Sequence, residues 1–319
     1  MSLLSQKHLQ NEEAAYKWVE AQIWPHGAQC PHCFEKKRVS KMEGKATRFG
    51  LYKCYACRKQ FRVTVGTIFA SSHVPLHLWL QAFYLIAGSK KGISANQLHR
   101  TLGVTLKTAW FMGHRIREAM RIGSLVPPMG GEGQTVEVDE TIYGRADTHP
   151  KGRRPLGRKV TNSAHKNVIV SLVQRDGGVR SFHVAGSTVG EVIPLVNQNI
   201  RKETFIMTDS AMLYKKQLGH FTSHDRVDHS IAEYVRYEPT KTVHTNTVEG
   251  YFSLFKRGMR GTYQHCKEKH LHRYLAEFDF RYNNRVKLGV TDEERAAKMV
   301  KGAQGKRLTY RSKTHGEMS

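Results

Sequence analysis

The sequence lacks any run of about 18 apolar residues, so no segment is suited to crossing a membrane. Its start carries Glu12 and Glu13 where a secretory signal would be apolar, so we expect the protein to stay in the cytoplasm. Neither a Walker-type G-x4-G-K-S/T sequence nor another glycine-rich phosphate loop is present, which argues against an ATP site. Acidic residues are also scarce, with 27 Asp and Glu against 51 Lys and Arg.

The basic excess gives the 319 residues a formal net charge of +24. It is densest at the front, because residues 1–130 hold 19 basic and 6 acidic side chains. A positive field of this size indicates a polyanionic partner, most often nucleic acid. On charge alone, a merely basic protein or one that binds acidic lipid remains an alternative.

Four of the five cysteines form a C-x2-C-x20-C-x2-C pattern, made of Cys30, Cys33, Cys54 and Cys57. Each C-x2-C turn directs two thiolates at one ion, and two turns complete a tetrahedron of sulfur. The pattern therefore predicts a zinc ribbon, within residues 1–65, that holds one structural Zn²⁺. Cys266 stands alone and is expected to be an ordinary thiol.

Residues 66–125 predict a helical region with a helix-turn-helix. Leu76 to Ala87 reads as one helix. Ser94 is placed to cap a helix that runs to Arg100, Gly103 supplies a turn, and Thr105 caps a helix from Leu106 to about Arg121. Lys107 and Thr108 lie at the start of that last helix, where base edges would be read. An ordinary pair of antiparallel helices is the alternative.

Residues 126–134 show no helical or strand-like hydrophobic periodicity, so we expect a linker there. After this linker, the sequence pattern indicates mainly strands. Two strands joined by Asp176-Gly177-Gly178 follow a first strand within TVEVDETIYG. A helix capped by Thr188, a strand ending at Asp209, a helix in AMLYKKQLGH, a possible fifth strand in RVDHS, and two long helices come next. This order predicts an RNase H-like mixed α/β domain over residues 135–290. The overall class is α+β multidomain.

Three carboxylates are candidates for a catalytic metal site: Asp139, Asp209 and Glu249. Asp139 interrupts an apolar strand, Asp209 ends another, and Glu249 begins a helix expected to pack beside them. Three such acids can hold two divalent cations about 3.5–4 Å apart, and Mg²⁺ or Mn²⁺ suits oxygen ligands. On chemistry alone, other acids remain competitors: Glu140, Asp147, Asp225, Asp228 and Glu233.

Over roughly residues 15–290, these motifs in this order resemble the zinc-ribbon DDE transposases of bacterial insertion sequences, particularly the ISXO-like group. The motifs are CPHC, CYAC, the helix-turn-helix, VEVDETIYG, TDS and HTNTVEGYFSLFKRG. The resemblance implies that Asp139, Asp209 and Glu249 are the three catalytic acids. It also implies a catalytic role for Lys256, seven residues after Glu249. Some relatives use Asn at the third position, so Asn246 is kept as the alternative ligand.

The resemblance further implies a two-metal-ion DNA transposase that cleaves insertion-sequence ends and transfers the freed 3′-OH into target DNA. Its partner is double-stranded DNA, and we expect a homodimer or higher oligomer on that DNA. The resemblance also implies association with the bacterial nucleoid. The basic stretch of residues 149–166 resembles the loop after the first strand in these enzymes. The expected DNA-binding residues are Lys107, Thr108, Arg153, Arg154, Arg158, Lys159, Lys256 and Arg257.

Residues 291–319 predict a basic C-terminal tail. Two other functions stay open. One is a domesticated DNA-binding regulator without catalysis, and the other is a structure-selective nuclease of the same fold. Metal-dependent strand cleavage distinguishes the transposase from the first, and strand transfer into a second duplex distinguishes it from the second.

Overall fold

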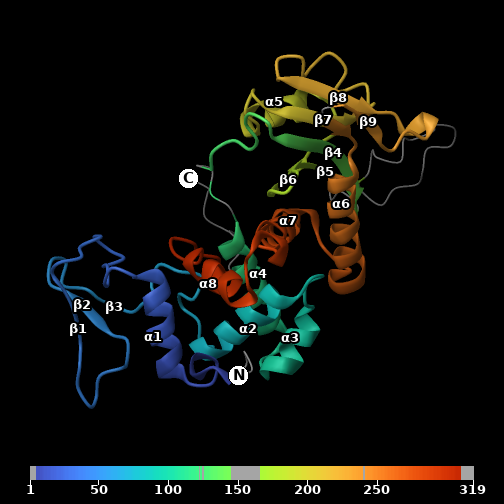
Figure 1. The fold of residues 1–319 in the computed structure, drawn as a ribbon. Coiled ribbons are helices and arrows are strands. Elements are labelled where there is room, and N and C mark those ends of the chain that lie inside the picture. The colour runs from blue at the N-terminus through green and yellow to red at the C-terminus, as the bar shows by residue number, and fades with distance from the viewer. Residues whose placement is uncertain (1–4, 122, 124–125, 145–165, 240, 310–319) are drawn as a thin grey trace, which may run out of the picture. The chain divides into compact units, whose positions relative to one another are not determined.

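A computed structural model describes residues 5–121, 123, 126–144, 166–239 and 241–309. The chain divides into two compact units (Figure 1). Unit 1 joins residues 1–121 to residues 290–319, and unit 2 is formed by residues 122–289. Within the described residues, no helix has both the length and the apolar character needed to span a bilayer.

Unit 1 combines a small antiparallel sheet with helices. The sheet has the order β1-β2-β3; β1 follows the first cysteine pair and β2 ends at Cys54, the first cysteine of the second pair. The elements of unit 1 are η2 (Lys7–Leu9), α1 (Glu12–Ile23), β1 (Val39–Lys41), β2 (Tyr52–Cys54), β3 (Gln60–Phe61), α2 (Leu76–Gly88), α3 (Ala95–Leu102), α4 (Leu106–Met120) and α8 (Asp292–Lys301).

Local capping explains the α3-turn-α4 segment. Ser94 accepts a hydrogen bond from the N–H of Gln97, and Thr105 accepts one from the N–H of Thr108. Between the two helices, Gly103 has φ 66°, a left-handed conformation that glycine adopts at little cost. The two helices and the turn at Gly103 therefore lie where the sequence predicts them.

The last helix, α8, lies in the segment that the charge pattern assigned to a basic tail. Thr291 and Glu294 form a capping box at its start, in which each side chain bonds the backbone of the other residue. The Arg295 guanidinium then donates to the carbonyl of Ala87 at the end of α2. Residues 292–301 thus belong to the packed part of unit 1.

Unit 2 is built on a mixed sheet. Among the described residues, five strands form it in the order β6-β5-β4-β7-β8. The pairs β4–β5 and β5–β6 are antiparallel, whereas β4–β7 and β7–β8 are parallel. The strands are β4 (Thr135–Tyr143), β5 (Asn167–Gln174), β6 (Val179–Val184), β7 (Phe205–Asp209) and β8 (Ser223–Val227), with a separate hairpin of β9 (Arg236–Glu238) and β10 (Lys241–Val243).

Helices cover both faces of this sheet. One core cluster joins Val136 and Val138 of β4 to Val192 and Val196 of α5, and it also includes Tyr214. A second cluster on the other face joins β5 and β6 to α6 and α7. The helical elements of unit 2 are α5 (Val189–Asn199), η3 (His229–Ile231), α6 (Asn246–Gly258), the π-helical turn η4 (Met259–Tyr263), α7 (Glu268–Asn283) and η5 (Val286–Leu288).

Three details of unit 2 differ from the sequence-based expectation. Residues 211–220 form successive turns rather than a helix, because their backbone bonds join residues three apart and Lys216 has φ 72°. Thr188 stands at the N-cap of α5, but its side chain makes no capping hydrogen bond. In the segment expected to be a linker, Met129 is buried and its backbone pairs with Ile200.

Candidate functional site

The front of unit 1 carries a structural zinc site. The Sγ atoms of Cys30, Cys33, Cys54 and Cys57 all lie within 4.8 Å of one another. The distances Cys30–Cys57 and Cys33–Cys54 are both 3.6 Å. Zn–S bonds of about 2.3 Å in a tetrahedron require sulfur separations of about 3.8 Å, so the four thiols fit one zinc ion.

The two cysteine turns repeat one backbone geometry. The N–H of Cys30 bonds the carbonyl of Glu35, and the N–H of Cys54 bonds the carbonyl of Lys59, each five residues on. The residue after each turn, Phe34 or Arg58, has φ 61°. This matched geometry aims both thiol pairs at one point, and the zinc predicted from cysteine spacing is therefore supported by the structure.

The catalytic candidates lie on neighbouring elements of unit 2. Strands β4 and β7 run parallel, with Thr135 beside Phe205 and Glu137 beside Met207. The same offset places Asp139 alongside Asp209, the last residue of β7. Two acids on adjacent parallel strands therefore meet at one edge of the sheet.

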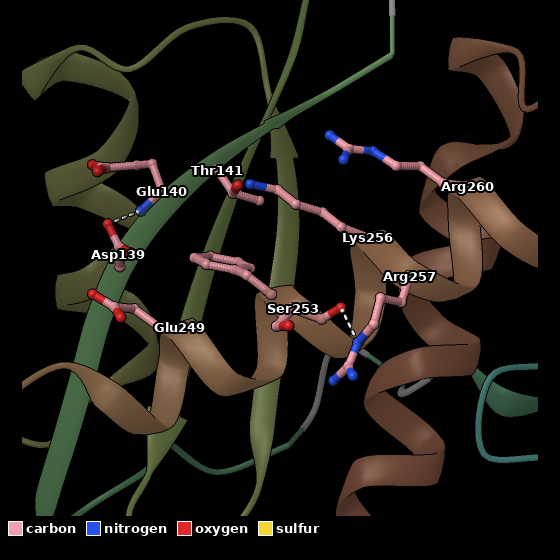
Figure 2. Close-up of a pocket in the computed structure, with 9 residues that line it drawn as sticks. Asp139, Glu140, Thr141, Glu249, Ser253, Lys256, Arg257 and Arg260 are labelled. Carbon is pink, nitrogen blue, oxygen red and sulfur yellow. Dashed lines mark hydrogen bonds between the residues drawn. The ribbon is translucent and has the colours of Figure 1, made fainter.

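Glu249 and Lys256 face the first of these acids from α6. Figure 2 shows the carboxylate of Glu249 extending to the side of Asp139, which itself accepts a hydrogen bond from the Glu140 N–H, while Lys256 extends toward Thr141. These side chains line an open pocket of about 630 Å³. The full lining is Asp139, Glu140, Thr141, Glu249, Phe252, Ser253, Lys256, Arg257 and Arg260.

The electrostatics of this pocket favour a bound cation. Burial, and then the negative charges of Asp209, Glu140 and Glu249, raise the pKa of Asp139 to about 8. Burial of the Lys256 ammonium and the nearby Arg260 lower the pKa of Lys256, although Asp139 opposes that shift. Several carboxylates that repel one another in a partly buried pocket form a set of oxygen ligands suited to Mg²⁺ or Mn²⁺.

Three of the competing acids, Asp225, Asp228 and Glu233, are engaged elsewhere, whereas Glu140 lines the same pocket. Asp225 is 2.5 Å from the Lys241 ammonium. Asp228 caps η3 through the N–H of Ser230, and Glu233 pairs with Arg236. Glu140 projects from the opposite face of β4, where it accepts a 2.5 Å hydrogen bond from the Tyr214 hydroxyl, and burial first of all raises its pKa to about 7. Asp147 lies outside the described residues.

Around the third acid, the structure separates Glu249 from the alternative ligand Asn246. Both residues are exposed, but Glu249 lines the pocket, whereas Asn246, at the first position of α6, is absent from the lining. The Nε2 atom of His229 lies 3.3 Å from Glu249 Oε1. The hydroxyl of Thr245 lies 3.4 Å from the same oxygen. The side chain of Glu249 is thus held from two sides.

The expected DNA-binding residues fall in different places. Lys107 is exposed in the first turn of α4, and the Thr108 hydroxyl is bonded to that of Thr105. Lys256 and Arg257 line the same pocket as Asp139 and Glu249. The four arginine and lysine residues expected in the basic loop, Arg153, Arg154, Arg158 and Lys159, lie outside the described residues.

Sequence reasoning missed three residues of this region: Glu137, His229 and Arg260. Arg260 follows Lys256 by four residues, so helical spacing would have placed it beside that lysine. Glu137 lies two residues before Asp139 and therefore on the same strand face. No local pattern marks His229, because its partner is 20 residues away in the chain.

Comparison with known proteins is consistent with these features. Residues 130–283 match the ISXO2-like transposase domain, and residues 10–60 match the transposase zinc-ribbon domain. The chain is also similar to a protein described as "Uncharacterized protein in transposable element ISH50" from Halobacterium salinarum. The two are 26% identical over 272 residues, which is 82% of this chain and 87% of that relative.

Proposed function

Because this chain belongs to the zinc-ribbon transposases with an ISXO2-like transposase domain, we propose that it cleaves DNA at insertion-sequence ends and joins the freed strand to target DNA. In the cleavage step, a water oxygen attacks phosphorus at the element's end and the bond to the 3′ oxygen breaks. In the transfer step, that 3′-OH attacks a target phosphodiester and displaces a target 3′ oxygen. The reaction needs no ATP, because one phosphodiester is exchanged for another.

The observation that carries this proposal is the convergence of Asp139, Asp209 and Glu249. The first two acids stand on neighbouring parallel strands, and the third faces Asp139 from α6. The strand order, with two antiparallel and two parallel pairings, supports assignment of unit 2 to the RNase H-like fold. In that assignment the three acids form the metal-binding site.

Two divalent cations, Mg²⁺ or Mn²⁺, fit these carboxylates, and when bound they would activate the attacking oxygen and neutralise charge on the phosphate. The carboxylates of Asp139, Asp209 and Glu249 would hold them. Lys256 supplies a positive charge two turns after Glu249 on the same helix face, about 10 Å along the axis. Its ammonium is suited to hold a DNA phosphate in line for attack, with Arg257 and Arg260 beside it.

For end recognition, we propose that unit 1 reads the DNA. The zinc ribbon is rich in lysine and arginine, and α3 and α4 are arranged as a helix-turn-helix pair around Gly103. Lys107 lies in the first turn of α4, the part of a recognition helix that contacts base edges. Two copies acting on two DNA ends would make the active form a dimer or a higher oligomer.

The direct test uses purified full-length protein, DNA that carries the element's ends, a second target duplex and Mg²⁺. We expect strand cleavage followed by joining of the 3′ end to the target, and both products should disappear with Asp209→Asn. End binding should persist in that variant, because the carboxylate repels DNA. Cleavage without joining would favour a nuclease, and binding without Mg²⁺-dependent cleavage would favour a regulator.

A further inference from the structure

Another acid of β4, Glu137, is completely buried. Its side chain is 0% exposed. It points to the same face of the strand as Asp139, since side chains two residues apart in a strand share a face. Burial of a carboxylate is costly unless hydrogen bonds and an opposite charge compensate it, so the partners of Glu137 reveal what this residue does.

Those partners are the free donors at the start of α6. Glu137 Oε2 accepts hydrogen bonds from the N–H groups of Thr247 at 2.8 Å and Val248 at 2.9 Å. Glu137 Oε1 accepts one from the Thr247 hydroxyl at 2.8 Å. The residue in the N-cap position, Thr245, makes no capping bond with its own side chain. A carboxylate from a strand 110 residues away therefore caps α6.

Arg175 completes the arrangement. Its Nε donates to Glu137 Oε1 at 2.7 Å. Its two terminal nitrogens donate to the carbonyls of Thr242 at 2.7 Å and His244 at 2.9 Å. His244 Nδ1 lies 3.2 Å from Glu137 Oε1. One guanidinium thus joins the carboxylate to the backbone that leads from β10 into α6.

This pair joins two of the three elements that carry the metal-site acids, β4 and α6, by a short path. Glu137 is two residues before Asp139, and Val248 is one residue before Glu249. We propose that Glu137 and Arg175 are a positioning pair that fixes Glu249 relative to Asp139 and so sets the divalent-cation affinity of the site, an inference that rests on the proposed function.

A cap from within α6 would satisfy the same helix N–H groups, but it would not couple the helix to β4. Stability alone also does not require an ion pair here, because well-packed apolar residues commonly replace a buried pair without loss. The link between strand and helix is what this arrangement adds. Residues that orient the ligands of a metal typically change metal affinity about 10–100-fold when they are replaced.

The test compares Glu137→Gln with a matched change, Glu277→Gln. Glu277 also is 0% exposed and also pairs with a buried arginine, Arg281, but that pair lies within α7. Binding of Mn²⁺ to the full-length protein is measured by electron paramagnetic resonance of the free ion, together with the Mg²⁺ concentration that gives half-maximal cleavage. Thermal unfolding reports the stability of each variant.

We expect Glu137→Gln to weaken Mn²⁺ binding and to raise the required Mg²⁺ concentration by about tenfold or more, as for other residues that orient metal ligands. Glu277→Gln should lower the unfolding temperature but leave Mn²⁺ affinity and the required Mg²⁺ concentration close to their wild-type values. Arg175→Lys keeps the charge but loses the forked geometry, so it should show the same metal defect, and it serves if Glu137→Gln fails to fold.

The proposal would be overturned if Glu137→Gln or Arg175→Lys bound Mn²⁺ as tightly as the wild type. It would also be overturned if the control, Glu277→Gln, lost as much Mn²⁺ affinity as Glu137→Gln. Failure of the proposed function would look different. In that case, wild-type protein would show no Mn²⁺ site that Asp139→Asn removes, whatever the state of Glu137.

Discussion

Asp139 combines two properties that oppose each other in a folded protein. It lies half-buried within a strand, and its negative charge is close to those of Asp209, Glu140 and Glu249. The raised pKa of Asp139 expresses the cost of keeping this carboxylate ionised. A site of this kind is retained for binding rather than for stability, because functional sites often reduce the stability of the fold.

We therefore expect Asp139→Asn to raise the unfolding temperature in buffer that contains zinc but no magnesium. The amide removes the cost of burying a carboxylate and, secondly, its repulsion by neighbouring acids. Each kcal/mol of relief corresponds to roughly 2–4 °C for a domain of 150–250 residues, the size class of unit 2. Differential scanning fluorimetry measures the change. Asp176→Asn is the control, since Asp176 is exposed, pairs with Lys287, and should give no gain. Added Mg²⁺ should stabilise the wild type more than Asp139→Asn, and a destabilised Asp139→Asn would contradict this view of the site.

Glu249 and Asn246 give a second prediction for single residues. Glu249→Gln should abolish Mg²⁺-dependent cleavage, because a neutral amide is a poor ligand for a hard cation, and Asn246→Ala should cleave at close to the wild-type rate. Cleavage of labelled end DNA measures both. If Glu249→Gln cuts normally and Asn246→Ala is inactive, the third ligand lies one helical turn earlier. Normal cutting by both would remove α6 from the active site.

Among the elements, those determined by local chemistry could be predicted from the sequence. The path of α3 and α4 follows from Ser94, Gly103 and Thr105, and each acts on residues within one turn. Residues 211–220 could not be predicted in this way. Tyr214 of that segment is buried and bonds Glu140, and this distant contact accompanies turns where composition suggested a helix.

The same distinction applies to the candidate site. The motifs place Asp139, Asp209 and Glu249 on two strands and a helix, and the register of β4 and β7 brings the first two side by side. His229 gave no such signal, and the spacing of Glu137 shows only that it shares a strand face with Asp139. Their roles depend on contacts to α6 that only the folded chain creates, one of them across 110 residues.

We expect the zinc ribbon, residues 24–65, to fold only when zinc is bound. Cys54 is buried in a small hydrophobic cluster with Cys30 and Phe61. Without zinc, this cluster is too small to stabilise the folded ribbon. Elemental analysis should find about one zinc per chain in the wild type, as expected for four closed ligands. Cys54→Ser should lose the metal and expose residues 24–65 to protease. Cys266→Ser, at the thiol outside the cluster, should keep both the zinc and the protease resistance. A zinc-free ribbon that resists protease would refute the prediction.

For the whole molecule, the division into two units decides which fragment is suitable for a test of end recognition. Unit 1 contains residues 290–319 as well as the front of the chain, and α8 packs on the helices of that unit. Removal of the front alone would leave α8 without its partner helices. The fragment of residues 122–289 corresponds to unit 2 and is the correct comparison.

We expect the full chain to bind DNA mainly through its positive charge, and to select end sequences through unit 1. The logarithm of the binding constant should fall by about 0.9 per phosphate contact for each logarithmic unit of salt. Fluorescence anisotropy with end DNA and a scrambled duplex measures both the slope and the preference. The fragment of residues 122–289 should show a smaller slope and no preference, because the zinc ribbon and α4 are absent. Full end preference in that fragment would move sequence recognition into unit 2, where Lys256, Arg257 and Arg260 would then be the first residues to replace.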